Sequence, residues 1–161
     1  MRVNPYVNDL QKFPQIINKE TIQQTILSVS KKPTSARFYA NGKQLTDQDF
    51  NRYQKQLNLD SIKPTQLVQY AVVVKRANMR SFATQDKVFK TPTEINLDRF
   101  QETALFPAEV VVVLHYSLNG QWAFVTSYNY SAWVPIDSIA LGKKRNYFQI
   151  SSSQRFFSHN W

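Results

Sequence analysis

The aromatic side chains of residues 120–135 are the group in this sequence best spaced to recognise a ligand. The stretch GQWAFVTSYNYSAWVP contains Trp122, Tyr128, Tyr130 and Trp133. Rings on a small β domain can stack on a ligand or a peptide. We therefore expect ligand contacts from these four residues, chiefly from Tyr128, Tyr130 and Trp133. The alternative is that at least one tryptophan fills the core.

Two charged residues could complete such a site. Arg80 could meet a carboxylate of the ligand, and Glu102 could meet a free amine. For Arg80 a structural role competes with this one, because an internal ion pair with Asp98 or Glu102 would also explain an arginine at this position. We favour the ion pair for Arg80 and keep both residues as candidates.

The sequence contains few groups for catalysis. It has no cysteine and only two histidines, His115 and His159. This excludes a disulfide, a thiolate metal site and a cysteine nucleophile, and it argues against a zinc site or a serine–histidine triad. His115 is expected to be a hydrogen-bonded histidine in an edge strand. We expect no cofactor, no metal and no catalysis by this chain alone.

The net charge of +9 and the pI near 9.8 suggest an anionic partner. The excess of Lys and Arg lies in residues 1–65 and 143–161, whereas residues 66–142 hold six basic and six acidic side chains. A nucleic-acid-binding barrel is therefore an alternative that the neutral middle of the chain makes unlikely. The sequence contains no run of about 18 apolar residues, so no membrane span is predicted.

Two helices are predicted in the first half of the chain. Over residues 15–30 the apolar side chains recur at helical spacing, and Thr21 to Gln24 fits a capping box. Over residues 47–57 a second helix has Thr46 as its N-cap, and its apolar face consists of Phe50, Tyr53 and Leu57. Between them, Asn41-Gly42 predicts a tight turn.

From about residue 66 the pattern predicts four or five strands. Leu118-Asn119-Gly120 separates two apolar runs and predicts a hairpin. The segment SAWVPIDSIAL predicts a further strand followed by a 3₁₀ turn. In the strand after the hairpin, Ala123 and Val125 share the face that would fill the barrel. Trp122 and Phe124 then point outward, toward the N-terminal helices, another domain or a ligand.

Four short segments follow one another along the second half of the chain: Arg80-Ser81-Phe82-Ala83-Thr84, Asp98 with Gln101, Trp122 through Val125, and Ala132-Trp133-Val134. In this order they resemble the bacterial SH3 domain of the SH3b1 type that accompanies NlpC/P60 cell-wall peptidases. The resemblance covers residues 68–141, and residues 1–66 resemble the stabilising segment ahead of that domain. Ala83 stands where the family has proline, and Ala132 stands where it has glycine.

The resemblance implies a mainly β chain with a small SH3-like barrel and a short α-helical N-terminal appendage. We expect a stabilising segment over 1–66 that packs on the barrel, a barrel over 67–142, and a basic, aromatic tail or linker over 143–161. The family's catalytic domain uses a cysteine and a histidine, and this sequence has no counterpart of it.

The function that the resemblance implies is that of a non-catalytic accessory module in the bacterial cell envelope. The family's enzymes are γ-D-glutamyl-L-diamino acid endopeptidases, so the implied partners are a peptidoglycan peptide, a cysteine-peptidase catalytic domain, or both. A protein-interaction module of the SH3 kind is a further alternative.

Overall fold

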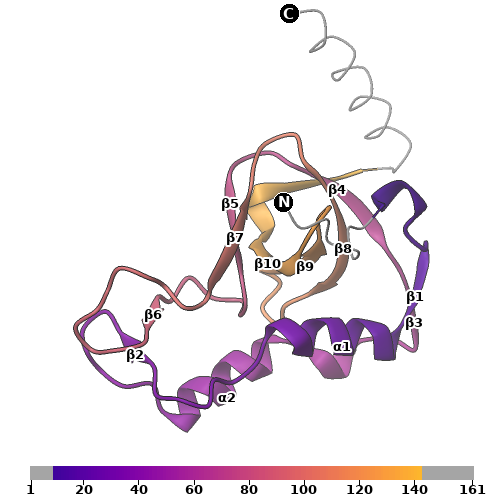
Figure 1. Ribbon diagram of the computed structural model, residues 1–161. Helices are drawn as coiled ribbons and strands as arrows, with labels where there is room; N and C mark the ends of the chain where they lie inside the picture. The colour runs from indigo at the N-terminus through magenta and orange to yellow at the C-terminus, as the bar shows by residue number, and fades with distance from the viewer. Residues whose placement is uncertain (1–8, 143–161) are drawn as a thin grey trace, which may run out of the picture.

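The computed structural model describes residues 9–142, in which β-strands dominate (Figure 1). One antiparallel sheet has the strand order β11-β4-β8-β9-β10-β5-β7. Its strands are β4 (Gln69–Val73), β5 (Ala77–Arg80), β7 (Gln101–Leu105), β8 (Val110–Tyr116), β9 (Trp122–Thr126), β10 (Ser131–Pro135) and β11 (Ile139–Gly142). The sheet has seven strands, more than the four or five that the sequence predicts.

The smaller elements lie before the sheet or between its strands. Two further pairs of strands form two-stranded sheets, β1 with β3 and β2 with β6. The bounds are η1 (Leu10–Lys12), β1 (Ile16–Asn18), α1 (Lys19–Val29), β2 (Phe38–Tyr39), α2 (Asp47–Gln56), η2 (Leu59–Ser61), β3 (Thr65–Leu67), β6 (Val88–Phe89) and η3 (Ile136–Ser138). Among these described helices none is long and apolar enough to cross a bilayer.

All seven strands of the large sheet share one interior, so the sheet curls into a small barrel. Valine and alanine dominate this interior, with Ala123 and Val125 contributed by β9. The parity argument is thus confirmed: the valine face of β9 is the barrel core. The core residues are Ala71, Val73, Ala77, Met79, Leu105, Val111, Val113, Ala123, Val125, Ala132, Val134 and Ile139.

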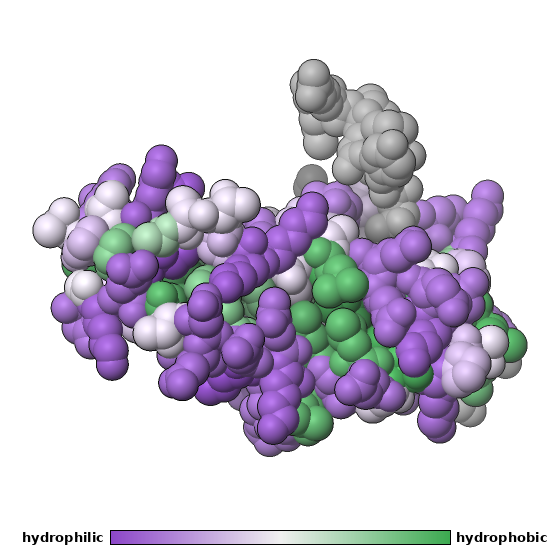
Figure 2. All heavy atoms as spheres, turned by 90° about the horizontal axis from the view of Figure 1, so that it is seen from below, coloured by the Kyte–Doolittle hydropathy of each residue, from purple (hydrophilic) through white to green (hydrophobic). Residues whose placement is uncertain are grey.

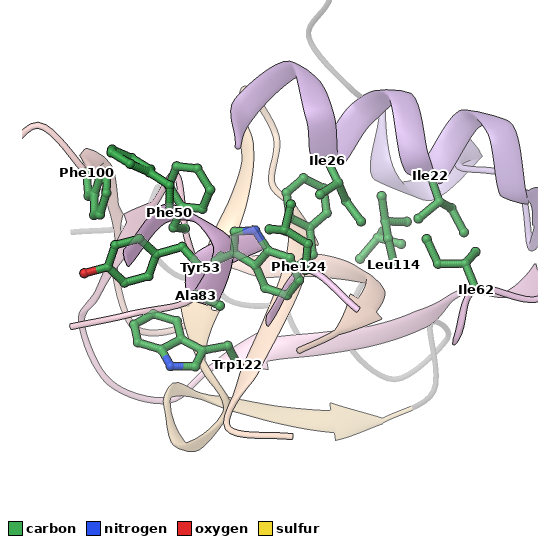
Figure 3. Packing of buried hydrophobic residues seen from close by; sticks show 14 of the residues in the cluster. Ile22, Ile26, Phe50, Tyr53, Ile62, Ala83, Phe100, Leu114, Trp122 and Phe124 are labelled. Carbon is green, nitrogen blue, oxygen red and sulfur yellow. The ribbon is translucent and has the colours of Figure 1, made fainter. Parts of the chain in front are cut away.

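The outward aromatic face of β9 is covered by the N-terminal segment. Trp122 and Phe124 belong to a second core, to which α1 contributes Ile22 and Ile26 (Figure 3). Both isoleucines are completely buried, and each such side chain contributes about 1.5–3 kcal/mol. Every residue of β9 is therefore buried, with Ala123 and Val125 inside the barrel and Trp122 and Phe124 in the second core.

Helix α1 begins at Lys19, within the predicted range 15–30 but before the predicted cap Thr21, and its cap is a different residue. Ile16 and Ile17 belong to β1, which pairs with β3 through Ile16↔Leu67 and Ile17↔Gln66. The side chain of Asn18 caps the helix by accepting a hydrogen bond from the Thr21 N–H over 2.9 Å. The predicted capping box at Thr21 is wrong, because Asn18 already fixes the first turn and Thr21 lies within the helix.

Helix α2 agrees with its prediction. Thr46 is the N-cap, and it forms a capping box with Asp49, in which each side chain accepts from the backbone N–H of the other. The predicted apolar face is buried, with Phe50 and Tyr53 on the helix and Leu57 just after it. The rings of Phe50 and Tyr53 meet edge to face at 6.2 Å.

The predicted turns are also present. Gly42 has a φ of +85°, and its N–H donates to the Tyr39 carbonyl in a tight turn. Gly120 has a φ of +72° in the hairpin that joins β8 to β9. Positive φ favours glycine at both places. Ala132, by contrast, lies within β10, so the departure from the family's glycine causes no strained turn.

Helix α2 and the β2–β6 ribbon lie together at one end of the molecule, away from the barrel (Figure 1). A cluster of aromatic rings joins this end to the rest. Tyr53 packs against Phe100 at 5.4 Å, and Phe82 packs against Phe100 at 5.1 Å. The predicted tail, residues 143–161, lies outside the described residues.

Candidate functional site

A groove of about 660 Å³ runs beside the edge strand β7. One side is the end of β7 with the turn that follows it, and the other is the loop between β9 and β10. Within the described sheet β7 pairs only with β5, so its other edge has no strand partner there. The lining residues are Asp9, Leu10, Gln11, Thr103, Ala104, Leu105, Phe106, Ala108, Glu109, Val110, Ser127, Tyr128 and Asn129.

Tyr128 presents its ring at this groove. The loop that carries it is closed by Ser127, whose N–H donates to the Tyr130 carbonyl over 2.7 Å and whose Oγ accepts from the Tyr130 N–H over 3.1 Å. This closure directs Tyr128 outward, and the residue is 65% exposed. Tyr128 is thus open to solvent, and its role as a ligand contact stays a prediction.

Tyr130 and Glu102 form a pair next to the groove. Glu102 lies exposed on β7, directly before the lining residue Thr103, and interacts electrostatically with the half-buried Tyr130 hydroxyl. Burial raises the pKa of Tyr130 to about 12, with further contributions from the charge and the hydrogen bond of Glu102. The tyrosine therefore stays protonated near neutral pH, and the carboxylate keeps free lone pairs for a cationic group.

The turn after β7 contributes residues that sequence reasoning missed. Phe106 is half exposed, and the Arg76 guanidinium lies over its ring at 5.6 Å. Ala108 adopts a φ of +76°, a region that residues with a Cβ rarely occupy. The Glu109 side chain accepts from the Phe106 N–H over 3.1 Å and holds the turn. The Phe-Pro-Ala-Glu sequence indicates a turn but does not reveal a groove.

Trp133 does not contribute to this site. It lies on β10, in the predicted strand, and is completely buried, so its prediction as a ligand contact is wrong. Its indole nitrogen donates to the Oγ of Ser30 over 3.1 Å, and its ring meets Phe124 at 5.2 Å. The residue is a core side chain because α1 packs over the outer face of β10, which the sequence of the strand alone does not show.

Trp122 is a core residue as well. It is 6% exposed and belongs to the outer cluster beneath the N-terminal segment. Its backbone N–H donates to the Oγ of Ser117 in the hairpin. Its prediction as a ligand contact is wrong because it is packed into this cluster, and the alternative that a tryptophan fills the core holds for both Trp122 and Trp133.

Arg80 forms the internal ion pair that the sequence analysis favours. Its Nη1 lies 2.7 Å from Asp98 Oδ2, and its Nη2 donates to the Asp86 carbonyl over 2.6 Å. Asp98 Oδ1 also accepts from the Val88 and Phe100 N–H groups. At 3% exposure Arg80 cannot reach a ligand carboxylate, so that candidate role is wrong. The partner is Asp98 and not Glu102.

His115 is a buried structural residue. Its Nε2 lies 3.1 Å from the Leu57 carbonyl and 3.0 Å from the Asn58 carbonyl, so Nε2 carries the proton and donates. Burial lowers the pKa of His115 below its usual value, against the raising effect of the two carbonyls. The residue is hydrogen-bonded as predicted, but β8 lies between β4 and β9 and is not an edge strand.

Among residues 9–142 no group of three acidic or histidine side chains is arranged to hold a metal ion. The groove instead offers the ring of Tyr128 and part of β7, and the carboxylate of Glu102 lies next to it. These groups suit recognition of a small polar ligand with an extended backbone.

Comparison with known proteins supports the resemblance seen in the sequence. Residues 87–135 match the family model of the SH3 domain of the SH3b1 type. No curated protein matches the chain. The resemblance to this domain and the prediction of a mainly β, SH3-like chain are confirmed.

The fold is similar to that of a solved NlpC/P60 endopeptidase from Photobacterium damselae subsp. piscicida. The TM-score is 0.64 at 21% sequence identity, and the match covers 81% of this chain. The same match covers 30% of the endopeptidase chain, so the present chain corresponds to a minor part of that protein.

Proposed function

We propose that this chain is a non-catalytic accessory module of an NlpC/P60-type cell-wall peptidase, acting in the bacterial cell envelope on the peptide of peptidoglycan. The match to an SH3 domain of the SH3b1 type and the similar fold of an NlpC/P60 endopeptidase support an accessory domain of a cell-wall peptidase. The finer role, positioning of a peptide, is argued from the groove.

The observation that carries the proposal is the position of the Tyr130–Glu102 pair beside the groove that Tyr128 lines. A short peptide with a free amino terminus needs a carboxylate for its ammonium group, and Glu102 supplies one that is open to solvent. The ring of Tyr128 provides contact area next to it. The free edge of β7 can pair with the peptide backbone, as strand edges do in other peptide-binding domains.

Such a site is expected to bind weakly by itself. A short, charged peptide buries little apolar area, and association costs several kcal/mol before any net affinity appears. We therefore assign full affinity to a complex in which a catalytic domain closes the groove. The present chain has no cysteine, so the cysteine nucleophile that the family resemblance implies must come from that other domain.

The proposal is tested by an NMR titration of the ¹⁵N-labelled chain with a peptidoglycan tripeptide that has a free amino terminus. Amide shifts are expected in residues 101–105 and 127–130, with millimolar affinity. The variants Glu102→Gln and Tyr128→Ala should each reduce the shifts severalfold. Glu20→Gln removes an exposed carboxylate from α1 and serves as the matched control.

Two results would contradict the proposal. One is a set of shifts that avoids both segments, and the other is an equal loss of binding in Glu102→Gln and Glu20→Gln. A peptide with an acetylated amino terminus provides a second check. It should bind more weakly to the wild type and no more weakly to Glu102→Gln, because the proposed role of Glu102 is to contact the ammonium group.

A further inference from the structure

The positive charge of the described residues is confined to one part of the fold. We call residues 31–56 and 86–99 the arm; it contains α2, β2 and β6. The arm holds nine Lys and Arg against five Asp and Glu, a net charge of +4. The other described residues, 9–30, 57–85 and 100–142, hold six of each and are neutral. The arm therefore accounts for the whole excess within residues 9–142.

Four of the five acidic side chains in the arm are already paired. Asp47 lies 2.7 Å from Lys32, and Asp98 pairs with the buried Arg80. Asp49 and Asp86 both pair with Arg52, at 3.5 and 3.7 Å. Within residues 9–142 the remaining seven cations of the arm have no acidic partner within 4.0 Å. They are Lys31, Arg37, Lys43, Lys55, Lys87, Lys90 and Arg99.

Five of these seven cations flank the β2–β6 ribbon. The pairs Phe38↔Phe89 and Tyr39↔Val88 set its register, so the next positions outward place Arg37 opposite Lys90. Other contacts bring the rest of the set to the ribbon. The Arg99 N–H donates to the Val88 carbonyl, and the Lys43 carbonyl accepts from the Tyr39 N–H. We call Arg37, Lys43, Lys87, Lys90 and Arg99 the ribbon cations.

The ribbon cations are held close together without neutralisation. Arg37 and Lys90 each lie one position beyond the paired residues Phe38 and Phe89, so two like charges flank the same end of the ribbon, and like charges near each other on neighbouring strands are destabilising. Four of the five side chains are exposed, and Arg37 is half-buried. Hydrophilic side chains project from this end of the molecule in Figure 2. A cluster of this kind is stabilised when an anion binds it.

We propose that the ribbon cations bind a linear polymer that carries a phosphate in each repeating unit. The cations follow a ribbon and do not converge on a pocket, so a single small anion would contact only one or two of them. A polymer can contact them in series and release its counterions at each contact. Arg37 and Arg99 add guanidinium groups, whose forks of donors fit phosphate oxygens.

This surface shares no residue with the peptide groove, and its proposed ligand differs in chemistry. It gives an accessory module a second attachment, to the anionic polymers that accompany peptidoglycan. The neutral remainder of residues 9–142 explains why the attachment involves the arm and not the barrel. The two proposals can fail independently, because one concerns a peptide at β7 and the other a polymer at β2 and β6.

The test is a fluorescence-anisotropy titration of the full chain with labelled inorganic polyphosphate at 50 and 200 mM salt. Binding is expected at the lower salt and should weaken at least tenfold at the higher. The variant Arg37→Gln/Lys87→Gln/Lys90→Gln should bind at least tenfold more weakly than the wild type. The control Lys12→Gln/Lys19→Gln/Lys63→Gln removes the same charge outside the arm and should change the affinity less than threefold.

Each other result overturns the proposal. An equal loss of polyphosphate affinity in both triple variants would show that binding depends on net charge alone. Orthophosphate that competes at the same phosphate concentration would show a site for a single anion. Tighter binding to vesicles of anionic lipid would assign the arm to a membrane surface, and tighter binding to single-stranded DNA would assign it to nucleic acid. None of the altered side chains is fully buried, and circular dichroism verifies that each variant is folded.

Discussion

The indole nitrogen of Trp133 donates a hydrogen bond to Oγ of Ser30 over 3.1 Å, although the two residues lie 103 positions apart. Ser30 in turn donates to the Ser81 carbonyl over 2.6 Å. The end of α1 is thus joined to β10 and to the segment after β5 through one buried hydroxyl group. This link fixes the N-terminal segment on the outer face of the barrel.

Ser30→Ala should lower the free energy of unfolding by about 1–3 kcal/mol, because it leaves the buried indole N–H without an acceptor. Urea unfolding followed by tryptophan fluorescence measures the change. Ser28→Ala is the matched control, since Ser28 is exposed and bonds only within its own helix. Equal effects of the two substitutions would contradict the importance of the link.

Breaking the buried Arg80–Asp98 pair should lower the free energy of unfolding far more than breaking a surface pair. Arg80→Met leaves Asp98 buried without its cation and should cost about 3–5 kcal/mol. Lys75→Met breaks the exposed Lys75–Asp137 pair and should cost less than about 1 kcal/mol. Thermal or urea unfolding of both variants measures the difference, and similar costs would refute the structural role of Arg80.

Two neighbouring positions on α1 test whether the helix covers the aromatic face. Ile26→Ala removes a completely buried side chain and should cost about 2–5 kcal/mol, whereas Leu27→Ala removes one that is 46% exposed and should cost much less. The first variant should also bind more of a dye that reports exposed apolar surface. If Leu27→Ala proved the more costly, the packing of α1 on the barrel would be wrong.

His115 should make stability fall as the pH falls below about 6.5. Burial lowers its pKa in the folded chain, so the unfolded chain binds more protons between that lowered value and the ordinary one near 6.5. Stability from this residue is complete above that window and is lost on acidification through it. Between pH 5 and pH 7.5, the urea midpoint of unfolding should change less steeply with pH in His115→Gln than in the wild type.

The chain alone should release no product from peptidoglycan peptides. It has no cysteine to act as a nucleophile. Incubation with tripeptide and tetrapeptide fragments, followed by mass spectrometry, should give the same result as buffer. The same assay with an added NlpC/P60 catalytic domain is the positive control. Product formed by the chain alone would refute the non-catalytic assignment.

Local patterns of the sequence predict much of the fold. The parity of Ala123 and Val125 gives the barrel face of β9, and Thr46 with Asp49 gives the start of α2, because both signals lie within a few residues. The cap of α1 is less predictable. Asn18 and Thr21 are both good caps, and the pairing of β1 with β3, far along the chain, decides between them.

The candidate site is harder to predict for the same reason. Tyr128 and Trp133 lie five positions apart in one aromatic stretch, yet one is exposed and the other is completely buried. The difference depends on α1, which covers β10 but not the loop before it. Phe106 shows the converse case, in which an ordinary turn residue lines a groove because the loop of Tyr128 lies across from it.

The distance along the chain between Ser30 and Trp133 also has a consequence for synthesis on the ribosome. Helix α1 is made well before β9 and β10, and 103 positions separate the two ends of the link. At a synthesis rate of about 5–20 residues per second, about 5–20 s pass between the synthesis of α1 and that of the strand that packs against its apolar face. During that interval Ile22 and Ile26 have no native partner on β9 or β10, so the nascent chain exposes a surface that a chaperone can bind.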